Sequence, residues 1–308
     1  MRGRSAGTLT FTSLVLCIAS AARAQELVPR AYLVTPVTSN AVTISYTRLD
    51  GDLEFAGAVP ITDATATVNL PVLSYYHSFS LFGRSANAAI VLPYGIGDFR
   101  GLVAEVPRSA HRAGFLDSAA RVSMNLLGGP AMDTREFAKW TQKTLLGLSF
   151  TVYAPTGQYD PTRLINYGSN RWAYRPEIGY SRRWDHWVLD GYVAATFFTD
   201  NNEFFVHNDR AQKPISAFET HLSYDFGRRA WVSLDGNFWR GGDTSLNGVF
   251  NPLTNQKSSR VGFTVAAPFT LHQSLKISYS KGAYVRYGGN YQSVSLAWQY
   301  AWIGWRFH

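Results

Sequence analysis

Phe218-Glu219-Thr220-His221-Leu222-Ser223-Tyr224-Asp225-Phe226 alternates between two kinds of side chain along its whole length. Successive side chains of a β-strand point to opposite faces, so Phe218, Leu222 and Phe226 share one face, while His221 and Asp225 share the other. Membrane-crossing strands are tilted and need about ten residues. The segment therefore predicts a strand with apolar surroundings on one side and polar surroundings on the other.

Similar alternation, noisier in the first half of the chain, recurs in nine other segments, and flanking turns more than clean alternation suggest two further strands at 68–81 and 85–94. Together they predict about twelve strands, an even number as in single-chain bacterial barrels. We therefore expect an all-β fold, a transmembrane antiparallel up-and-down β-barrel. The expected strands cover residues 42–47, 68–81, 85–94, 120–126, 146–152, 172–181, 187–197, 218–226, 232–238, 261–265, 275–280 and 294–302.

The lengths of the connections support this topology. With the N-terminus in the periplasm, the short turns become periplasmic and the longer loops face outward, as membrane barrels prefer. The exception is 128–143, a long periplasmic connection, where Asp133 to Trp140 predicts a short capped helix. This helix either plugs the barrel mouth or rests against it, and we favour the second position. The short turns lie near 82–84, 185, 227–229 and 268–271, and the long loops at 50–66, 95–113, 156–170, 200–213 and 241–257.

The N-terminus predicts export. Arg2 and Arg4 precede the short apolar run Leu9 to Ala19, and Ala22-Arg23-Ala24 is an A-x-A cleavage site. Residues 1–24 are thus expected to be a signal peptide and residues 25–308 the barrel, located in the bacterial outer membrane. Cys17, the single cysteine, lies inside the expected signal peptide.

The composition excludes several classes of protein. Aromatic residues make up 15% and charged residues 16% of the chain, and the mean hydropathy is −0.12. The expected mature chain contains no apolar run of about eighteen residues, so membrane-spanning helices are not expected. The net charge of +8, or +5 without the three signal-peptide arginines (8 − 3), is too dispersed to indicate nucleic acid. A soluble periplasmic β-protein remains open, because alternation alone does not prove lipid contact.

Aromatic side chains cluster at the expected strand ends and predict two girdles at the membrane interfaces. The periplasmic girdle would contain Trp184, Trp187, Phe226, Trp231 and Trp302, and the outer girdle Trp172, Phe198, Trp239 and Tyr284.

The polar faces of the expected strands carry charges that must line water or pair with one another, because Arg or Lys facing lipid costs about 2–4 kcal/mol at the membrane midplane. Two interpretations follow: a channel whose opposed charges set selectivity, or a packed interior in which the charges cancel. In the channel, charge reversal at Arg175 or Arg260 is expected to shift ion preference. The candidate lumen residues are Arg121, Arg171, Arg175, Glu177, Arg183, Asp190, Glu219, His221, Asp225, Asp235, Arg260 and Lys276.

No catalytic site is expected. His221 and Ser223 are similar to the His and Ser of outer-membrane phospholipases. However, the Asn-Gly that neighbours them in that family is absent here. Residues two apart on a strand are also poorly placed for a hydrogen bond between a nucleophile and a base. The seven histidines are scattered without zinc-like spacing. No phosphate-binding loop or cofactor motif is present. We therefore predict a non-enzyme with no metal and no cofactor.

Several motifs resemble the outer-membrane transporters grouped as the meta-pathway phenol-degradation family. The most specific are Ala154-Pro155-Thr156-Gly157-Gln158-Tyr159-Asp160 and Asn166-Tyr167-Gly168-Ser169-Asn170-Arg171-Trp172, and Thr199 to Phe205 and Trp298-Gln299-Tyr300 add to them. The resemblance implies an envelope barrel. The segment 156–170 predicts an ordered outer loop, either a rigid structural element or a ligand gate, with the candidates Tyr159, Asp160, Asn166 and Asn170.

The expected function is a porin-like outer-membrane channel for small solutes, including aromatic or other hydrophobic compounds. The alternative is a non-conducting structural or interaction barrel. The expected partners are outer-membrane lipid, the barrel-assembly machinery and an unidentified small solute, without nucleic acid.

Overall fold

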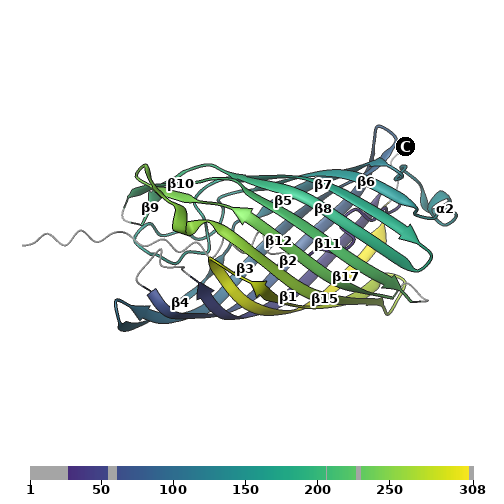
Figure 1. The fold of residues 1–308 in the computed structure, drawn as a ribbon. Coiled ribbons are helices and arrows are strands. Elements are labelled where there is room, and N and C mark those ends of the chain that lie inside the picture. The colour runs from purple at the N-terminus through teal and green to yellow at the C-terminus, as the bar shows by residue number, and fades with distance from the viewer. Residues whose placement is uncertain (1–26, 55–60, 206, 227–229, 305–308) are drawn as a thin grey trace, which may run out of the picture.

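A computed structural model describes residues 27–54, 61–205, 207–226 and 230–304. The chain forms a closed antiparallel barrel of twelve strands, which confirms the predicted fold (Figure 1). The ring consists of β1 (Ser39–Glu54), β2 (Ile61–Leu81), β3 (Arg84–Val103), β5 (Ala119–Leu127), β6 (Thr144–Tyr153), β7 (Ala173–Trp184), β8 (Trp187–Phe198), β11 (Ile215–Asp225), β12 (Trp231–Gly241), β15 (Gln256–Pro268), β16 (Gln273–Tyr284) and β17 (Gly288–Ile303).

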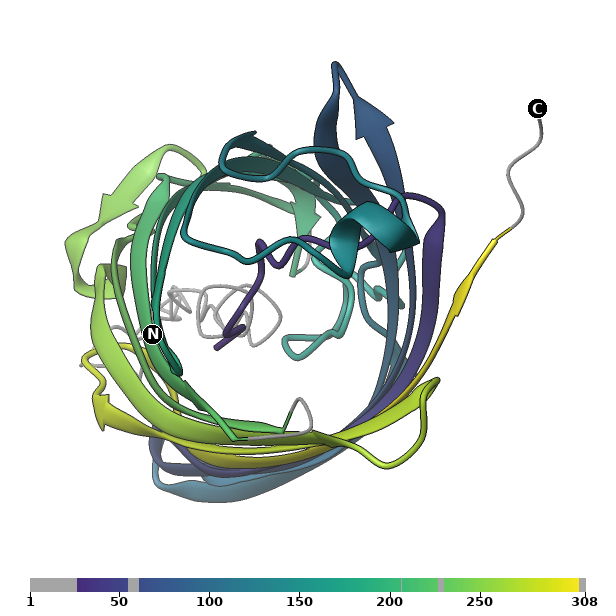
Figure 2. The ribbon, with the colours of Figure 1, turned by 90° about the vertical axis from the view of Figure 1, so that its right-hand side faces the viewer.

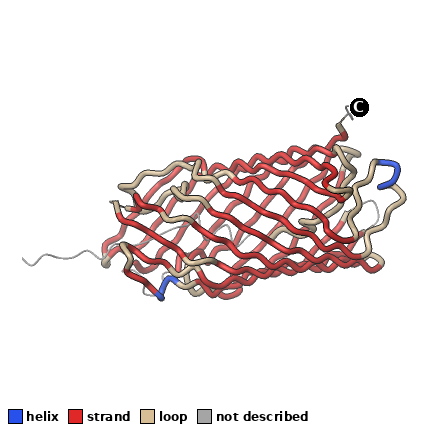
Figure 3. The backbone as a smooth tube through the Cα atoms, turned by 90° about the horizontal axis from the view of Figure 1, so that it is seen from above, coloured by secondary structure: helices blue, strands red, loops and turns tan. Residues whose placement is uncertain are grey.

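The barrel closes through the first and last strands. β1 pairs with β17 from Ser39 opposite Ile303 to Glu54 opposite Gly288, and its other edge pairs with β2. In the tube view the strands form one continuous wall with loops at the two ends (Figure 3). Closure satisfies the backbone donors and acceptors of every ring strand, which a lipid environment requires.

The prediction of an outer loop at 95–113 is wrong, because this segment forms strands. β3 continues to Val103 and forms a hairpin with β4 (Val106–Phe115), which pairs only with β3 in the described structure. Ala104 and Glu105 both have positive φ at the tip, as in a two-residue hairpin turn of type I′. The outward face of the hairpin carries Asp98, Arg100 and His111, all exposed, so its sequence lacks the alternation of apolar and polar residues that marks the lipid-facing strands.

Two other predicted loops also contain strands. β9 (Asn201–Phe204), β10 (Asn208–Gln212), β13 (Thr244–Leu246) and β14 (Val249–Asn251) form a four-stranded sheet at the outer end, followed by the 3₁₀ turn η2 (Pro252–Thr254). The predicted loop 50–66 is shorter than expected, because β1 reaches Glu54 and β2 begins at Ile61.

At the periplasmic end, the predicted helix is present as α2 (Thr134–Phe137). Its capping box has the form expected from the sequence: the Asp133 side chain accepts from the backbone N–H of Glu136, and the Glu136 side chain accepts from that of Asp133. None of the helices in the described residues is long and apolar enough to span a membrane.

The outer surface of the ring carries large apolar side chains on strand after strand. Ile178, Val193, Phe218 and Leu234 are 54%, 59%, 49% and 68% exposed, although each lies in mid-strand. Water-soluble proteins rarely expose an apolar patch of more than a few hundred Å². A continuous apolar band around a closed ring is typical of a surface that contacts lipid.

The predicted girdles are partly wrong. Trp172, Trp184, Trp187, Phe226 and Tyr284 are exposed on the outside. Trp239 is fully buried and donates through Nε1 to Gln256 Oε1 at 2.9 Å. Phe198 packs against the same buried cluster, and the Arg30 guanidinium lies 4.5 Å from the centre of the Trp231 ring. These three face inward because they share a strand face with lumen residues, and strand-end position alone does not reveal the face.

A charge on the lipid-facing wall should destabilise the barrel. Val193 lies in mid-strand on β8, opposite Phe218 and Ile178, which are also exposed. We expect Val193→Arg to lower the free energy of unfolding by about 2–4 kcal/mol, because the guanidinium would face hydrocarbon. Urea unfolding in lipid vesicles measures the change. Ser295→Arg, a lumen-facing control, should change stability far less, and equal losses in the two variants would contradict the orientation.

Candidate functional site

The candidate lumen residues line the inner face of the strands or the approach to it. Arg175 and Glu177 on β7, Asp190 on β8, Glu219 and His221 on β11, Asp235 on β12 and Arg260 on β15 alternate with the exposed apolar residues of the outer face. Arg121, Asp225 and Lys276 are partly exposed inside, whereas Arg171 is buried just before β7. These side chains therefore lie on the part of the inner surface that is formed by β5, β6, β7, β8, β11, β12, β15 and β16, which we call the charged wall.

Most of these charges are paired. Arg175 contacts Glu219 at 2.7 Å and Glu177 at 3.1 Å, and Arg121 approaches Glu177 at 3.4 Å. On the next strands, His221 Nδ1 lies 2.8 Å from Asp235, which also accepts from the hydroxyls of Ser233 and Thr264. Buried ions require such partners, because an unpaired charge in a low-dielectric interior is costly.

Two further candidates, Arg171 and Arg260, contact aromatic rings and neutral groups. The Arg171 guanidinium lies 4.4 Å from the centre of the Phe198 ring and hydrogen-bonds Gln212. Arg260 is 2% exposed, lies over the Tyr291 ring and donates to Ser280 Oγ at 2.9 Å. Arg171 and Arg260 are thus held rigidly at the wall.

The segment 27–38 precedes β1 and lies inside the ring, where it is seen in purple in the axial view (Figure 2). Its Tyr32 is 2% exposed, and the hydroxyl donates to Glu177 Oε1 at 3.0 Å and lies 3.2 Å from Ser149 Oγ, whose hydroxyl can donate to it. A Cβ on Gly147 or Gly179 would lie 2.3 or 2.0 Å from the Tyr32 ring. These two glycines therefore form the slot that accepts the ring.

Arg30 fixes the segment to the next strands. Its guanidinium pairs with Asp225, which also pairs with Arg183. Its backbone N–H donates to Asp190 at 3.2 Å, and the N–H of the following residue, Ala31, donates to the Tyr192 hydroxyl at 3.0 Å. The segment thus covers much of the charged wall.

The periplasmic end of the segment joins the loop that carries α2. Val34, Met132 and Leu145 form a buried cluster, with Phe137 and Trp140 packed against it. The Val37 N–H donates to the Met132 carbonyl at 2.8 Å. The loop therefore packs on the N-terminal segment at the periplasmic mouth.

The opposite inner wall, β17, β1, β2 and β3, carries no charged side chain on its lumen face among the described residues of the membrane-spanning part. We call it the uncharged wall. Its lining residues alternate with exposed apolar residues, and unlike the buried residues of the charged wall they are largely half-exposed. They are mainly hydroxyl-bearing or small and apolar: Thr43, Ser45, Thr47, Leu70, Val72, Ser74, Tyr76, Ala89, Val91, Ser293, Ser295 and Ala297.

The outer loop 154–172 folds across the mouth. Tyr167 packs with Val68 and Phe99, while Leu164 and Ile165 pack near Tyr287 from the far side of the ring. The anchor is Asp117, which is 4% exposed and accepts hydrogen bonds from the N–H of Gly157 and of Ser169. The loop is therefore ordered and bound to the wall.

Two of the four outer-loop candidates, Asp160 and Asn166, make contacts within the loop, and the other two, Tyr159 and Asn170, contact β9. Asp160 accepts from both the hydroxyl and the N–H of Thr162, which lower the pKa of its carboxyl, with Arg163 acting in the same direction. Asn166 bonds the backbone of Asp160 and Arg163. Asn170 has φ of 50° and donates to Asn201 at 3.1 Å. Tyr159 donates to the Glu203 carbonyl at 3.1 Å.

Sequence reasoning missed the segment 27–38 and the anchor Asp117. The segment has no alternation and crosses no membrane, so no periodic signal marks it. The available signal was that Pro29 and Arg30 lie between the expected cleavage site and the first expected strand. Residues in this gap belong to no expected strand, so they must occupy some other place in or near the barrel.

A closed antiparallel ring with an apolar outer band and a polar interior defines a class, the outer-membrane type of β-barrel. Solved structures share the fold. The COG4313 outer membrane channel from Pseudomonas putida F1 has a TM-score of 0.76 at 18% identity, covering 90% of this chain and 100% of that one. The transport unit of the autotransporter AIDA-I from Escherichia coli has a TM-score of 0.51 at 10% identity, covering 94% and 95%. The translocator domain of the autotransporter NalP from Neisseria meningitidis has a TM-score of 0.50 at 12% identity, covering 90% of each.

Within that class, residues 50–298 match the family described as "Putative MetA-pathway of phenol degradation". The chain belongs to this family, which confirms the resemblance carried by the loop motifs. A search of curated proteins found no match.

Proposed function

We propose that the protein is an outer-membrane channel that passes small uncharged solutes, aromatic compounds among them, along its uncharged wall. The observation that supports this proposal is that the inner surface of the barrel is divided into the charged wall and the uncharged wall. The ionic groups are mostly paired and largely covered by the segment 27–38. The hydroxyl-bearing and apolar residues of the uncharged wall mostly stay half-exposed, apart from Tyr76, whose hydroxyl contacts Thr35 of the segment, and Leu70, which packs against the outer loop. A wall that offers hydroxyls and apolar surface without fixed charge favours solutes such as phenols.

One solved protein that shares this fold is an outer membrane channel, and the description of the family refers to phenol degradation. Both agree with a route for aromatic solutes through this barrel.

A single carboxylate on the uncharged wall tests the proposal. Ser45 lies on β1 opposite Ala297 and Val72, two other lumen-facing residues. We expect Ser45→Asp to slow phenol entry into proteoliposomes several-fold and to shift ion preference toward cations, because a fixed negative charge would stand in the uncharged path. Ser45→Asn, a neutral variant of the same size, should retain phenol entry. Equal phenol entry through both variants would contradict the proposed path.

A non-conducting structural barrel is the second candidate, favoured by the segment that fills part of the lumen. It predicts that neither phenol nor ions pass the intact protein, and that the Ser45 substitutions change nothing.

A further inference from the structure

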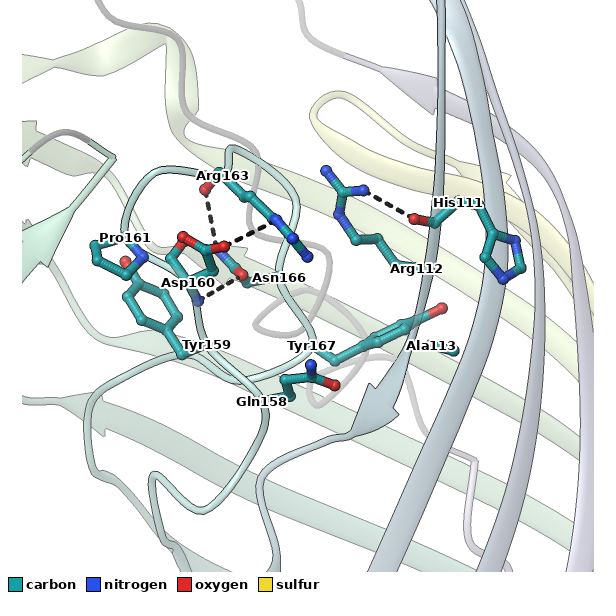
Figure 4. A pocket seen from close by; sticks show the side chains of 10 residues that line it. All are labelled: His111, Arg112, Ala113, Gln158, Tyr159, Asp160, Pro161, Arg163, Asn166 and Tyr167. Atoms are coloured by element: carbon teal, nitrogen blue, oxygen red, sulfur yellow. Dashed lines mark hydrogen bonds and ion pairs between the residues drawn. The ribbon is translucent and has the colours of Figure 1, made fainter.

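A pocket of about 330 Å³ opens at the outer mouth, between β4 and the loop segment 158–167 (Figure 4). Arg112 enters it from β4, while Gln158, Tyr159, Arg163 and Tyr167 enter it from the loop. The pocket lies apart from the charged wall and from the segment 27–38, so the proposed function does not use it.

Arg112 forms no ion pair at contact distance in the described part of the chain, although its charge acts on the Asp160 carboxylate across the pocket. Its Nε–H donates to the Ile165 carbonyl at 3.0 Å and its Nη1 donates to the His111 carbonyl at 2.8 Å. Both acceptors are neutral, and a guanidinium has five N–H donors, so donors remain for a ligand. The ring of His111 lies on the opposite face of β4, next to Asp98 at 2.8 Å.

The other charged groups in the pocket compensate one another. Arg163 pairs with Asp160 at 2.8 Å, and Asp160 also accepts from Thr162. The charge of Arg112 is therefore left in excess. The Gln158 amide, which makes no hydrogen bond to a described residue, adds a neutral donor on the loop side.

Two tyrosine rings give the pocket rigid flat surfaces. Tyr167 is 5% exposed and lies against the bare backbone of β3, where a Cβ on Gly95 would be 2.7 Å from its ring. Burial, together with the nearby charge of Asp98, raises the pKa of the Tyr167 hydroxyl. That hydroxyl has no hydrogen-bond partner among the described residues. Tyr159 is fixed by hydrogen bonds to Glu203 and Asn201.

We propose that this pocket binds a small organic anion, a carboxylate attached to a flat apolar body, with the carboxylate on Arg112 and the body between the tyrosines. A guanidinium recognises a carboxylate through two parallel hydrogen bonds, and an aromatic face accepts a planar ring. Arg112 lies on the interior face of the hairpin, so the ligand comes from the medium and not from lipid headgroups beside the barrel. The proposal holds whichever solute crosses the lumen.

Equilibrium dialysis of labelled benzoate against the detergent-solubilised mature chain tests this site. We expect saturable binding that Arg112→Gln weakens by about tenfold or more, since hydrogen bonds to charged groups contribute about 1.5–3 kcal/mol. Arg100→Gln is the matched control: it removes the same charge from the same hairpin, but Arg100 is exposed on the lipid-side face, opposite Ser109. The control should bind benzoate as the unaltered protein does. Heat-modified gel mobility verifies that both variants fold.

Three results would overturn the proposal: benzoate binding that does not saturate, equal binding by Arg112→Gln and the control, or displacement of benzoate by inorganic phosphate at equal concentration. The last result would show that the flat body contributes nothing to recognition. A negative result here leaves the path along the uncharged wall untouched, because phenol entry is measured separately.

Discussion

Removal of residues 27–37 is expected to raise the single-channel conductance of the barrel several-fold. These residues occupy the lumen and are held by the Tyr32 slot, the Arg30 contacts and the cluster around Val34. Because they cover the charged wall, their loss should also expose Arg175 and Glu219 to the solution in the pore. Planar-bilayer recordings of the refolded protein, with and without these residues, measure the effect.

A milder variant displaces the segment from its slot without removing any of its residues. Gly179→Val keeps every residue of the segment, but its side chain would overlap the Tyr32 ring, since even a Cβ would lie 2.0 Å from it. We expect a conductance between those of the intact and the shortened proteins. Unchanged conductance in both variants would show that the segment does not limit the pore.

Arg175→Met is expected to destabilise the barrel by about 3–5 kcal/mol, the range found when one partner of a buried ion pair is removed. Arg175 is 7% exposed and pairs with both Glu177 and Glu219. Its loss would leave two carboxylates facing each other with only the longer contacts of Glu177 to Arg121 at 3.4 Å and of Glu219 to His221 at 3.6 Å. Urea unfolding in lipid vesicles, followed by tryptophan fluorescence, measures the difference.

The triple variant Arg175→Met, Glu177→Gln, Glu219→Gln is the control, because it removes the charges together. Replacing a whole buried ionic group by neutral residues is often close to neutral for stability. The triple variant should therefore recover most of the loss. A single variant as stable as the unaltered protein would mean that lumen water screens these carboxylates.

Within the membrane, the sequence was sufficient to predict the strands. Segments such as 218–226 alternate because one face meets lipid and the other the lumen, and this constraint leaves a period of two. Outside the membrane no lipid requires every second residue to be apolar, although neighbouring strands still pair through their backbones. The hairpin of β3 and β4 and the sheet of β9, β10, β13 and β14 were therefore mistaken for loops.

The candidate lumen residues could be named from the sequence, but their partners could not. Arg175 and Glu219 lie 44 positions apart and meet because β7, β8 and β11 are neighbours. The role of Gly147 and Gly179 depends on a ring from a segment more than a hundred residues earlier. A glycine that makes room for a distant ring leaves no periodic pattern in a single sequence.

The hairpin of β3 and β4 stays paired with β2 as far as Val103, which lies opposite Ile61, so only its turn at Ala104 and Glu105 pairs with no described strand. Its length can therefore change without disturbing the seam between β1 and β17, since loop tips tolerate insertion best where few contacts depend on them. The turn at Ala104 and Glu105 is accordingly the place to graft a foreign peptide for display on the cell surface.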